Sequence, residues 1–196
     1  MIYDQASLKR LESEFYPLES VGTGTNVTIG VATGADDIFI TTDPKLVERD
    51  RLLPLAMAAD ISSGQLKWSG HYLVNPWNGQ GFADLATYPR LRAYFDLHRE
   101  RLMRRHVGKK QPDRWYRTID RVHPKVAAGA KLYIADIQSR LNPVLDRGET
   151  YAHHNLYVIT SVGWDLEVLG GLLLSHVAQF FIECYAVRMR GRAIAR

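Results

Sequence analysis

Residues 27–41 read VTIGVATGADDIFIT, and this stretch decides the class of fold that the sequence predicts. Residues 27–31 alternate in the way that is typical of a strand, with larger side chains at every second position. The segment 33–37 combines threonine, glycine and aspartate and favours a turn. Residues 38–41 then favour a return strand, so we predict a β-hairpin over 27–41.

Beyond this hairpin, strands and helices follow one another without the regular alternation of a parallel α/β protein. Further strands are expected at 71–74, 131–135, 144–145 and 156–160. Helices are expected at 5–15, 88–107 and from a cap at Asp165 to about Met189, and residues 52–59 are expected to be a short helix or irregular. This order predicts one α+β domain over 1–196, with a mixed or antiparallel sheet, packed helices and a linker helix within 1–17.

The composition is that of an ordinary soluble globular domain. Hydrophobic residues make up 46% of the 196 positions, and the one cysteine, Cys184, excludes an internal disulfide and fits a reducing compartment. The first residues lack the pattern of a secretory signal. The most apolar stretch, 166–182, is too short and too polar for a membrane span, so we expect no membrane partner.

Positive charge is concentrated in one part of the sequence. Residues 90–125 contain twelve basic and four acidic residues, a net charge of +8, although the whole chain carries only +4. Four more arginines and no acid follow Glu183. In the helix expected at 88–107 the apolar stripe is Leu91, Tyr94, Phe95, His98 and Leu102, and the arginines fall mostly outside it. This distribution suits a polyphosphate partner, and the alternative is a solvated helix face with a loose tail.

Within the basic window, residues 109–117 read KKQPDRWYR. Lysines and arginines neutralise phosphates, arginines can also bind guanine edges, and exposed aromatic rings can stack on bases. The alternative is that Trp115 and Tyr116 are buried core residues and that only the charges are exposed. Both interpretations remain open from the sequence.

Three other motifs suggest chemistry but have simpler explanations. Glycines 22, 24 and 30 lack the spacing of a dinucleotide loop, so a bend before the hairpin is favoured. The sequence Asn75-Pro76-Trp77-Asn78 resembles the Asn-Pro-Pro-Tyr motif of amino-methyltransferases, but its third and fourth positions do not match, and a turn after a strand is favoured. His153-His154 would point to opposite faces of a strand, which predicts no metal site and a polar loop able to touch a ligand.

Direct evidence for catalysis is absent from the sequence. It contains no nucleophile elbow, no phosphate-binding loop and no convincing carboxylate pair. Cys184 lies among aromatic and aliphatic residues, as a buried structural thiol does. Whether the chain belongs to an enzyme therefore cannot be decided from its motifs.

The order of segments resembles the TaqI-like C-terminal specificity domain, the target-recognition domain of adenine-specific DNA methyltransferases, and especially fused restriction-modification enzymes. The resemblance covers about residues 11–191 and is most specific at IGVATG (29–34). The other matching segments are 35–40 (ADDIFI), 52–55 (LLPL), 60–61 (DI), 72–77 (YLVNPW), 88–91 (YPRL), 115–117 (WYR), 131–137 (KLYIADI), 154–160 (HNLYVIT) and 169–175 (LGGLLLS). Such domains usually follow a catalytic domain and continue into a last basic segment and strand, so the chain is expected to be an excised or truncated domain.

The resemblance implies a sequence-specific DNA recognition module that is non-catalytic by itself and forms part of an adenine-specific DNA methyltransferase in the bacterial cytoplasm. Its partners would be double-stranded DNA and the methyltransferase catalytic domain of the same polypeptide. That domain would bind S-adenosylmethionine, and this chain would bind no cofactor. The residues expected to contact DNA are Thr33, Asp36, Arg101, Arg104, Arg105, Lys109, Lys110, Arg114, Trp115, Tyr116, Arg117, Arg121, Arg140 and His153.

Among these, base contacts are expected from Thr33, Asp36, Arg117, Arg121, Arg140 and His153. The alternative function is a ligand- or protein-binding regulatory domain whose basic surface pairs with an acidic protein. A self-contained enzyme is a third alternative, disfavoured because no coherent active site appears.

Overall fold

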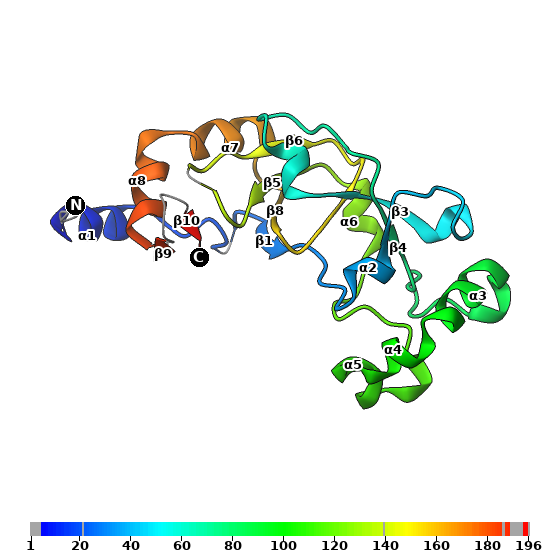
Figure 1. The fold of residues 1–196 in the computed structure, drawn as a ribbon. Coiled ribbons are helices and arrows are strands. Elements are labelled where there is room, and N and C mark those ends of the chain that lie inside the picture. Colours follow the sequence, from blue (N-terminus) through cyan, green and yellow to red (C-terminus); the bar gives the residue numbers. More distant parts are fainter. Residues whose placement is uncertain (1–4, 21, 139, 186, 189–193, 196) are drawn as a thin grey trace.

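The computed structural model describes the chain except residues 1–4, 21, 139, 186, 189–193 and 196 (Figure 1). One antiparallel sheet has the strand order β1-β8-β5-β6, and a mixed sheet has the order β2-β4-β3-β7. The strands of the first sheet are β1 (Thr25–Ile29), β5 (Lys131–Ala135), β6 (Val144–Asp146) and β8 (Leu156–Ser161), and those of the second are β2 (Ile40–Thr41), β3 (Leu52–Ala56), β4 (Tyr72–Val74) and β7 (Tyr151–Ala152). The short strands β9 (Val187–Arg188) and β10 (Ile194–Ala195) pair with each other. The α+β class predicted from the sequence is confirmed.

Most helices lie toward the two ends of the molecule, and α2 and α6 lie between them (Figure 1). In Figure 1, α3, α4 and α5 lie together at one end, and α7 and α8 lie at the other, beside the antiparallel sheet. The helices are α1 (Gln5–Glu14), α2 (Asp36–Phe39), α3 (Pro89–Leu97), α4 (Arg99–Arg104), α5 (His106–Lys110), α6 (Pro124–Ala128), α7 (Leu166–Leu173) and α8 (His176–Tyr185). Single 3₁₀ turns are η1 (Arg49–Arg51), η2 (Ala58–Ile61), η3 (Leu85–Thr87) and η4 (Pro112–Arg114). Within the described part of the chain, no helix has the length and apolar character that a membrane span requires.

The hairpin predicted over 27–41 does not form. Strand β1 pairs with β8, in a register that sets Val27 opposite Ile159. Residues 36–39 are the helical turn α2, which begins with two aspartates and buries Ile38 and Phe39. Acidic residues favour a helix N-terminus, and a short apolar run fits a buried helical turn as well as a strand.

The expectation of a helix or irregular structure at 52–59 is wrong for most of the segment, because residues 52–56 form β3 between β4 and β7. Proline cannot donate a ladder hydrogen bond, which makes Pro54 unusual within a strand. Strand β7 pairs only with Leu55 and Ala56 of β3. At Pro54, β3 therefore pairs with β4 alone and has no strand on its other side. The missing donor is tolerated there.

The long helix predicted at 88–107 is three short helices. The chain leaves helical geometry at Arg105, whose ψ is 153°, and α5 then folds back on α4. Gly108 lies inside α5, where a Cβ atom would come within 2.3 Å of the Leu102 oxygen. The expected apolar stripe is correct at Leu91, Phe95 and Leu102, which are fully buried.

The C-terminal helix begins as predicted, because the Asp165 carboxylate accepts hydrogen bonds from the backbone N–H groups of Glu167 and Val168. It is divided into α7 and α8 rather than continuous. Its predicted end at Met189 lies outside the described residues, as does the side chain of Cys184.

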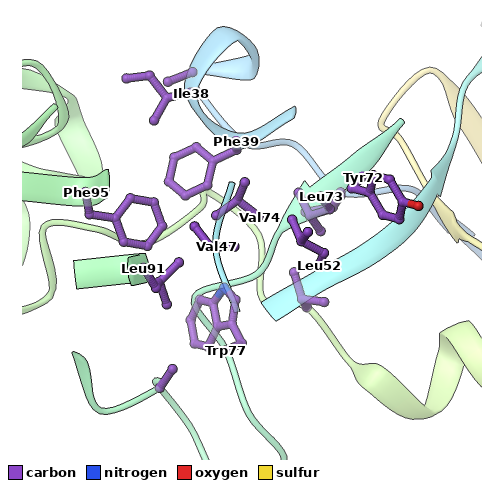
Figure 2. Packing of buried hydrophobic residues seen from close by; sticks show 14 of the residues in the cluster. Ile38, Phe39, Val47, Leu52, Tyr72, Leu73, Val74, Trp77, Leu91 and Phe95 are labelled. Carbon is purple, nitrogen blue, oxygen red and sulfur yellow. The ribbon is translucent and has the colours of Figure 1, made fainter. Parts of the chain in front are cut away.

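The largest core joins α3 to the mixed sheet. Figure 2 shows Phe95 and Leu91 of α3 facing Phe39 of α2, Val74 of β4 and Trp77. Two smaller clusters of buried residues flank the antiparallel sheet. The segment 89–121, which we call the basic lobe, is therefore fixed on the sheet by its own apolar residues.

A buried ion pair, which the sequence did not reveal, connects β5 to the end of β6. Lys131 and Asp146 have fully buried side chains whose Nζ and Oδ2 atoms are 3.0 Å apart. Burial lowers the pKa of Lys131. Burial alone would raise the pKa of Asp146, but hydrogen bonds from Glu149, Thr150 and Lys131 hold it below its ordinary value.

Candidate nucleic-acid interface

Three loops meet where the basic lobe joins the sheets, and we call residues 31–37, 117–121 and 153–155 the junction. The N–H groups of Ile119 and Asp120 donate to the Thr33 and Ala32 oxygens over 3.3 and 3.1 Å. The His154 N–H donates to the Val31 oxygen over 3.1 Å. Segments that are far apart in sequence thus form one hydrogen-bonded unit.

Two glycines of the 27–34 segment allow these loops to approach. A Cβ atom on Gly30 would lie 2.5 Å from the Ala152 oxygen and would overlap the His153 oxygen. Gly34 has a φ of +74°, which side chains other than glycine adopt at a cost. The glycines that make IGVATG distinctive therefore serve the junction, not a hairpin turn.

Arg105 holds the basic lobe against the junction. Its guanidinium donates to the oxygens of Thr33, Trp115 and Arg117 over 2.9, 3.1 and 2.6 Å, and to that of Leu102 over 3.2 Å. Burial, with a contribution from the charge of Arg117, lowers the pKa of Arg105 to about 10, so it is still charged at neutral pH. Arg105 was expected to contact DNA, and in this structure its donors are used inside the protein.

Thr33, Asp36 and His153 form a hydrogen-bonded chain across the junction. The buried Thr33 hydroxyl donates to one Asp36 oxygen, and His153 Nε2 lies 3.1 Å from the other. Burial alone would raise the pKa of Asp36, but the hydrogen bonds from Thr33 and His153 lower it. Thr33 and His153 are buried, so in this conformation neither side chain is presented to a base; Asp36 is partly exposed.

The structure brings His154, which the sequence analysis did not select, beside His153. Their ring centroids are 4.0 Å apart. The expectation that these side chains point to opposite faces is wrong, because residues 153–155 lie in a turn closed by the Leu156 N–H and the His153 oxygen. The alternation of side chains holds only within a regular strand.

The aromatic residues of the basic lobe are core residues, which was the alternative interpretation. Trp115 is 6% exposed, and the Tyr116 hydroxyl donates to the Ala83 oxygen. Arginines lie over these and neighbouring rings at 4.9 to 5.9 Å from the centroid: Arg99 over Trp115, Arg114 over Phe82, and both Arg117 and Arg121 over Trp77. The rings therefore hold guanidinium groups instead of offering open faces to bases.

The exposed cations of the basic lobe differ in how far they are neutralised. Arg101 makes a two-pronged ion pair with Asp37, and Arg104 pairs with Glu100 one helical turn away. The remaining expected cations have no acidic partner among the described residues, and they are Lys109, Lys110, Arg114, Arg117 and Arg121. Arg117 donates to the Gln111 side chain over 2.5 Å, which fixes its direction.

Arg140, also expected to contact DNA, lies apart from the junction. It lines a cavity of about 720 Å³ together with η2, the loop after β5, Leu174 just after α7 and residues of α8. Leu141, His176 and Gln179 share this lining. The structure thus separates Arg140 from the other expected contact residues.

The two motifs interpreted as turns are turns. The Asn75 carboxamide accepts from the Trp77 N–H, and the buried Trp77 ring stacks on Phe82 at 4.1 Å. This packing leaves no room for a flipped base between the asparagine and the ring. Gly22 and Gly24 have φ values of +97° and +57° in the bend before β1.

The fold and site therefore define an α+β domain with an arginine-rich lobe set on two sheets. Over 94–95% of its length the chain is 45% identical to the Type II methyltransferase M.BstVI of Geobacillus stearothermophilus and 46% identical to M.PaeR7I of Pseudomonas aeruginosa. It is 43% identical to M.XhoI of Xanthomonas vasicola. The resemblance to restriction-modification methyltransferases is confirmed, and the chain is related to one segment of them, since it spans only 32–34% of their length. No protein-family model matches the chain.

The fold also occurs in a larger enzyme. The Type IIL restriction-modification enzyme MmeI, whose structure was solved in complex with DNA, superposes with a TM-score of 0.62 over 92% of this chain and 24% of its own. The sequences are only 14% identical, so this likeness concerns the fold alone.

Proposed function

We propose that this domain recognises the DNA target sequence of a Type II methyltransferase. The observation that carries the proposal is the set of cations without acidic partners beside a junction whose loops are held together by hydrogen bonds. The similarity to methyltransferases over about one third of their length supports it, because a segment without catalytic motifs suits a recognition role.

One group of residues would contact phosphates and another would contact bases. Lys109, Lys110 and Arg114 are exposed and suit phosphates, which need charge more than a fixed geometry. Arg117 is held by Gln111 and by the Trp77 ring, and Arg121 lies over the same ring, so both suit base edges.

Methyl transfer would be carried out by the part of the relatives that this chain does not match. Two motifs that could suggest a cofactor site have structural roles, because the Asn75–Asn78 turn is packed and the glycines at 22 and 24 form a bend. We propose that the cofactor is bound by a catalytic segment of the same polypeptide and that this domain presents DNA to it.

Salt dependence of duplex binding tests the proposal. If about five cations meet phosphates, log affinity should fall against log salt with a slope of roughly −4 to −5, measured by fluorescence anisotropy on a mixed-sequence duplex. The double variant Lys109→Ala/Lys110→Ala should reduce the slope by about two. The matched control replaces Lys45 and Lys67, which are exposed lysines outside the basic lobe. An affinity independent of salt would contradict the proposal and favour an acidic protein partner.

A further inference from the structure

A cluster of metal-ligating side chains lies in the junction, outside the arginines that the proposed function uses. Asp36, His153 and His154 each offer one ligand atom, and these atoms all lie within 4.8 Å of one another. Asp36 Oδ2 and His153 Nε2 are 3.1 Å apart. The three residues come from two loops that the backbone of Val31 already connects.

The spacing suits one ion with tetrahedral geometry. Ligands that are about 2.0–2.1 Å from Zn²⁺ lie about 3.3 Å from one another, which is close to the present separation of Asp36 and His153. The side chain of His154 is exposed and can rotate by the small amount that the remaining distance requires. Two imidazoles and one carboxylate are ligands that Zn²⁺ prefers, whereas Mg²⁺ and Ca²⁺ prefer oxygen alone.

The surroundings already hold two of the ligands in place. Thr33 donates to the Asp36 oxygen Oδ1, which leaves Oδ2 directed at His153. His153 is 4% exposed, and its position is fixed by the bridge to Val31. Hydrogen bonds that orient a ligand in this way are typical of metal sites.

Two buried polar atoms in the same turn have no hydrogen-bond partner. They are His153 Nδ1 and the Asn155 side-chain oxygen. When Nε2 of a histidine binds a metal, Nδ1 carries the ring proton and needs an acceptor, and an oxygen without a partner lies in the same turn. This observation is independent of the spacing of the three ligand atoms.

We propose that Asp36, His153 and His154 bind one Zn²⁺ ion. His153 would bind through Nε2 as the neutral imidazole, so its one ring proton would move, through solvent, from Nε2 to Nδ1. Three protein ligands leave a fourth position for water. The ion would cross-link the loop 33–37 to the turn 153–155 and so stiffen the junction.

Titration with Co²⁺ tests the site, because tetrahedral Co²⁺ has strong visible absorption bands. We expect the tag-free, chelator-treated chain to bind one equivalent of Co²⁺ with such bands, and Zn²⁺ to abolish them by displacement. His154→Asn should weaken binding at least about tenfold, since it removes one of three ligands. His106→Asn, which changes an exposed histidine outside the cluster, should leave binding unchanged.

His154 is chosen because it is exposed, so its replacement should leave the melting temperature in chelator unchanged. Zn²⁺ should raise the melting temperature of the wild-type chain but not that of His154→Asn. The proposal is overturned if Co²⁺ gives no tetrahedral spectrum, or if His154→Asn and the wild-type chain bind it equally. This result does not depend on DNA binding, so the two proposals fail separately.

Discussion

Replacing Arg105 by methionine should unfold the junction more readily while leaving the helices of the basic lobe intact. Arg105 is the side chain that connects α4 to the loop at Thr33 and to the segment 115–117. Methionine keeps the length and the apolar stem of the side chain but removes all its donors.

The magnitude follows from the contacts. Four charge-assisted hydrogen bonds contribute about 6 kcal/mol at about 1.5 kcal/mol each. The burial that lowers the pKa of Arg105 from 12.5 to about 10 opposes this by up to about 3 kcal/mol, less where solvent screens the charge. We expect the variant to lose about 3 kcal/mol of unfolding free energy.

Urea unfolding followed by tryptophan fluorescence measures the loss. The matched control is Arg104→Met, which changes the neighbouring residue, removes only an exposed ion pair with Glu100 and should cost less than about 0.5 kcal/mol. Arg105→Lys should recover little, because one ammonium cannot reach several carbonyls as the forked guanidinium does. Equal stability of the Arg105 and Arg104 variants would refute this account of the junction.

Three further predictions concern the scaffold. Lys131→Met should cost about 3–5 kcal/mol because it leaves Asp146 charged and buried, whereas Arg147→Ala at an exposed ion pair should be nearly neutral in urea unfolding. The pKa of Asp146 is lowered in the fold, so the ionised carboxylate stabilises the folded chain above about pH 4, and this contribution is lost as the pH falls through the folded pKa. In an acid titration, Asp146→Asn should therefore lose less unfolding free energy than the wild-type chain does. Gly30→Ala should lower the unfolding free energy by at least about 4 kcal/mol, because its Cβ atom clashes with β7 and the following turn. Gly79→Ala, whose Cβ atom meets open space, should leave the melting temperature unchanged. A stable Gly30 variant would contradict the packing described.

The sequence predicted the elements whose pattern is local. The strands at 131–135 and 156–160 appear at the expected places, and the Asp165 cap was visible because capping depends on neighbouring backbone groups. The sequence did not indicate which strands pair with one another. The partner of β1 is β8, about 130 residues away, and nothing within 27–41 distinguishes that strand from the arm of a hairpin.

The basic lobe could be located by its charge, but the roles of its arginines could not be separated. Arg101, Arg104 and Arg105 follow one another closely in sequence, yet two pair with acids and one binds backbone carbonyls. Glu100 is one turn away in the same helix, but Asp37 comes from α2 and the carbonyl oxygens that Arg105 binds come mainly from Thr33 and the segment 115–117. Only the tertiary structure decides which cations are left for a ligand.

The closeness of His153 and His154 to Asp36 also could not be predicted from the sequence. The rule that neighbours on a strand point apart was sound, but residues 153–155 lie in a turn that joins β7 to β8. Asp36, expected in a turn of its own hairpin, reaches them because α2 packs against this turn region. No spacing in the sequence indicates that these three side chains meet.

Selection from a randomised duplex library tests the central claim, recognition of a DNA sequence, most directly. The wild-type chain should enrich one short motif at low salt. Arg117→Ala should lose or change one base pair of that motif, a discrimination of about 1–3 kcal/mol, while Arg104→Ala should keep the motif and at most weaken binding evenly. Failure to enrich any motif would contradict the account, as would a changed motif for Arg104→Ala beside an unchanged one for Arg117→Ala.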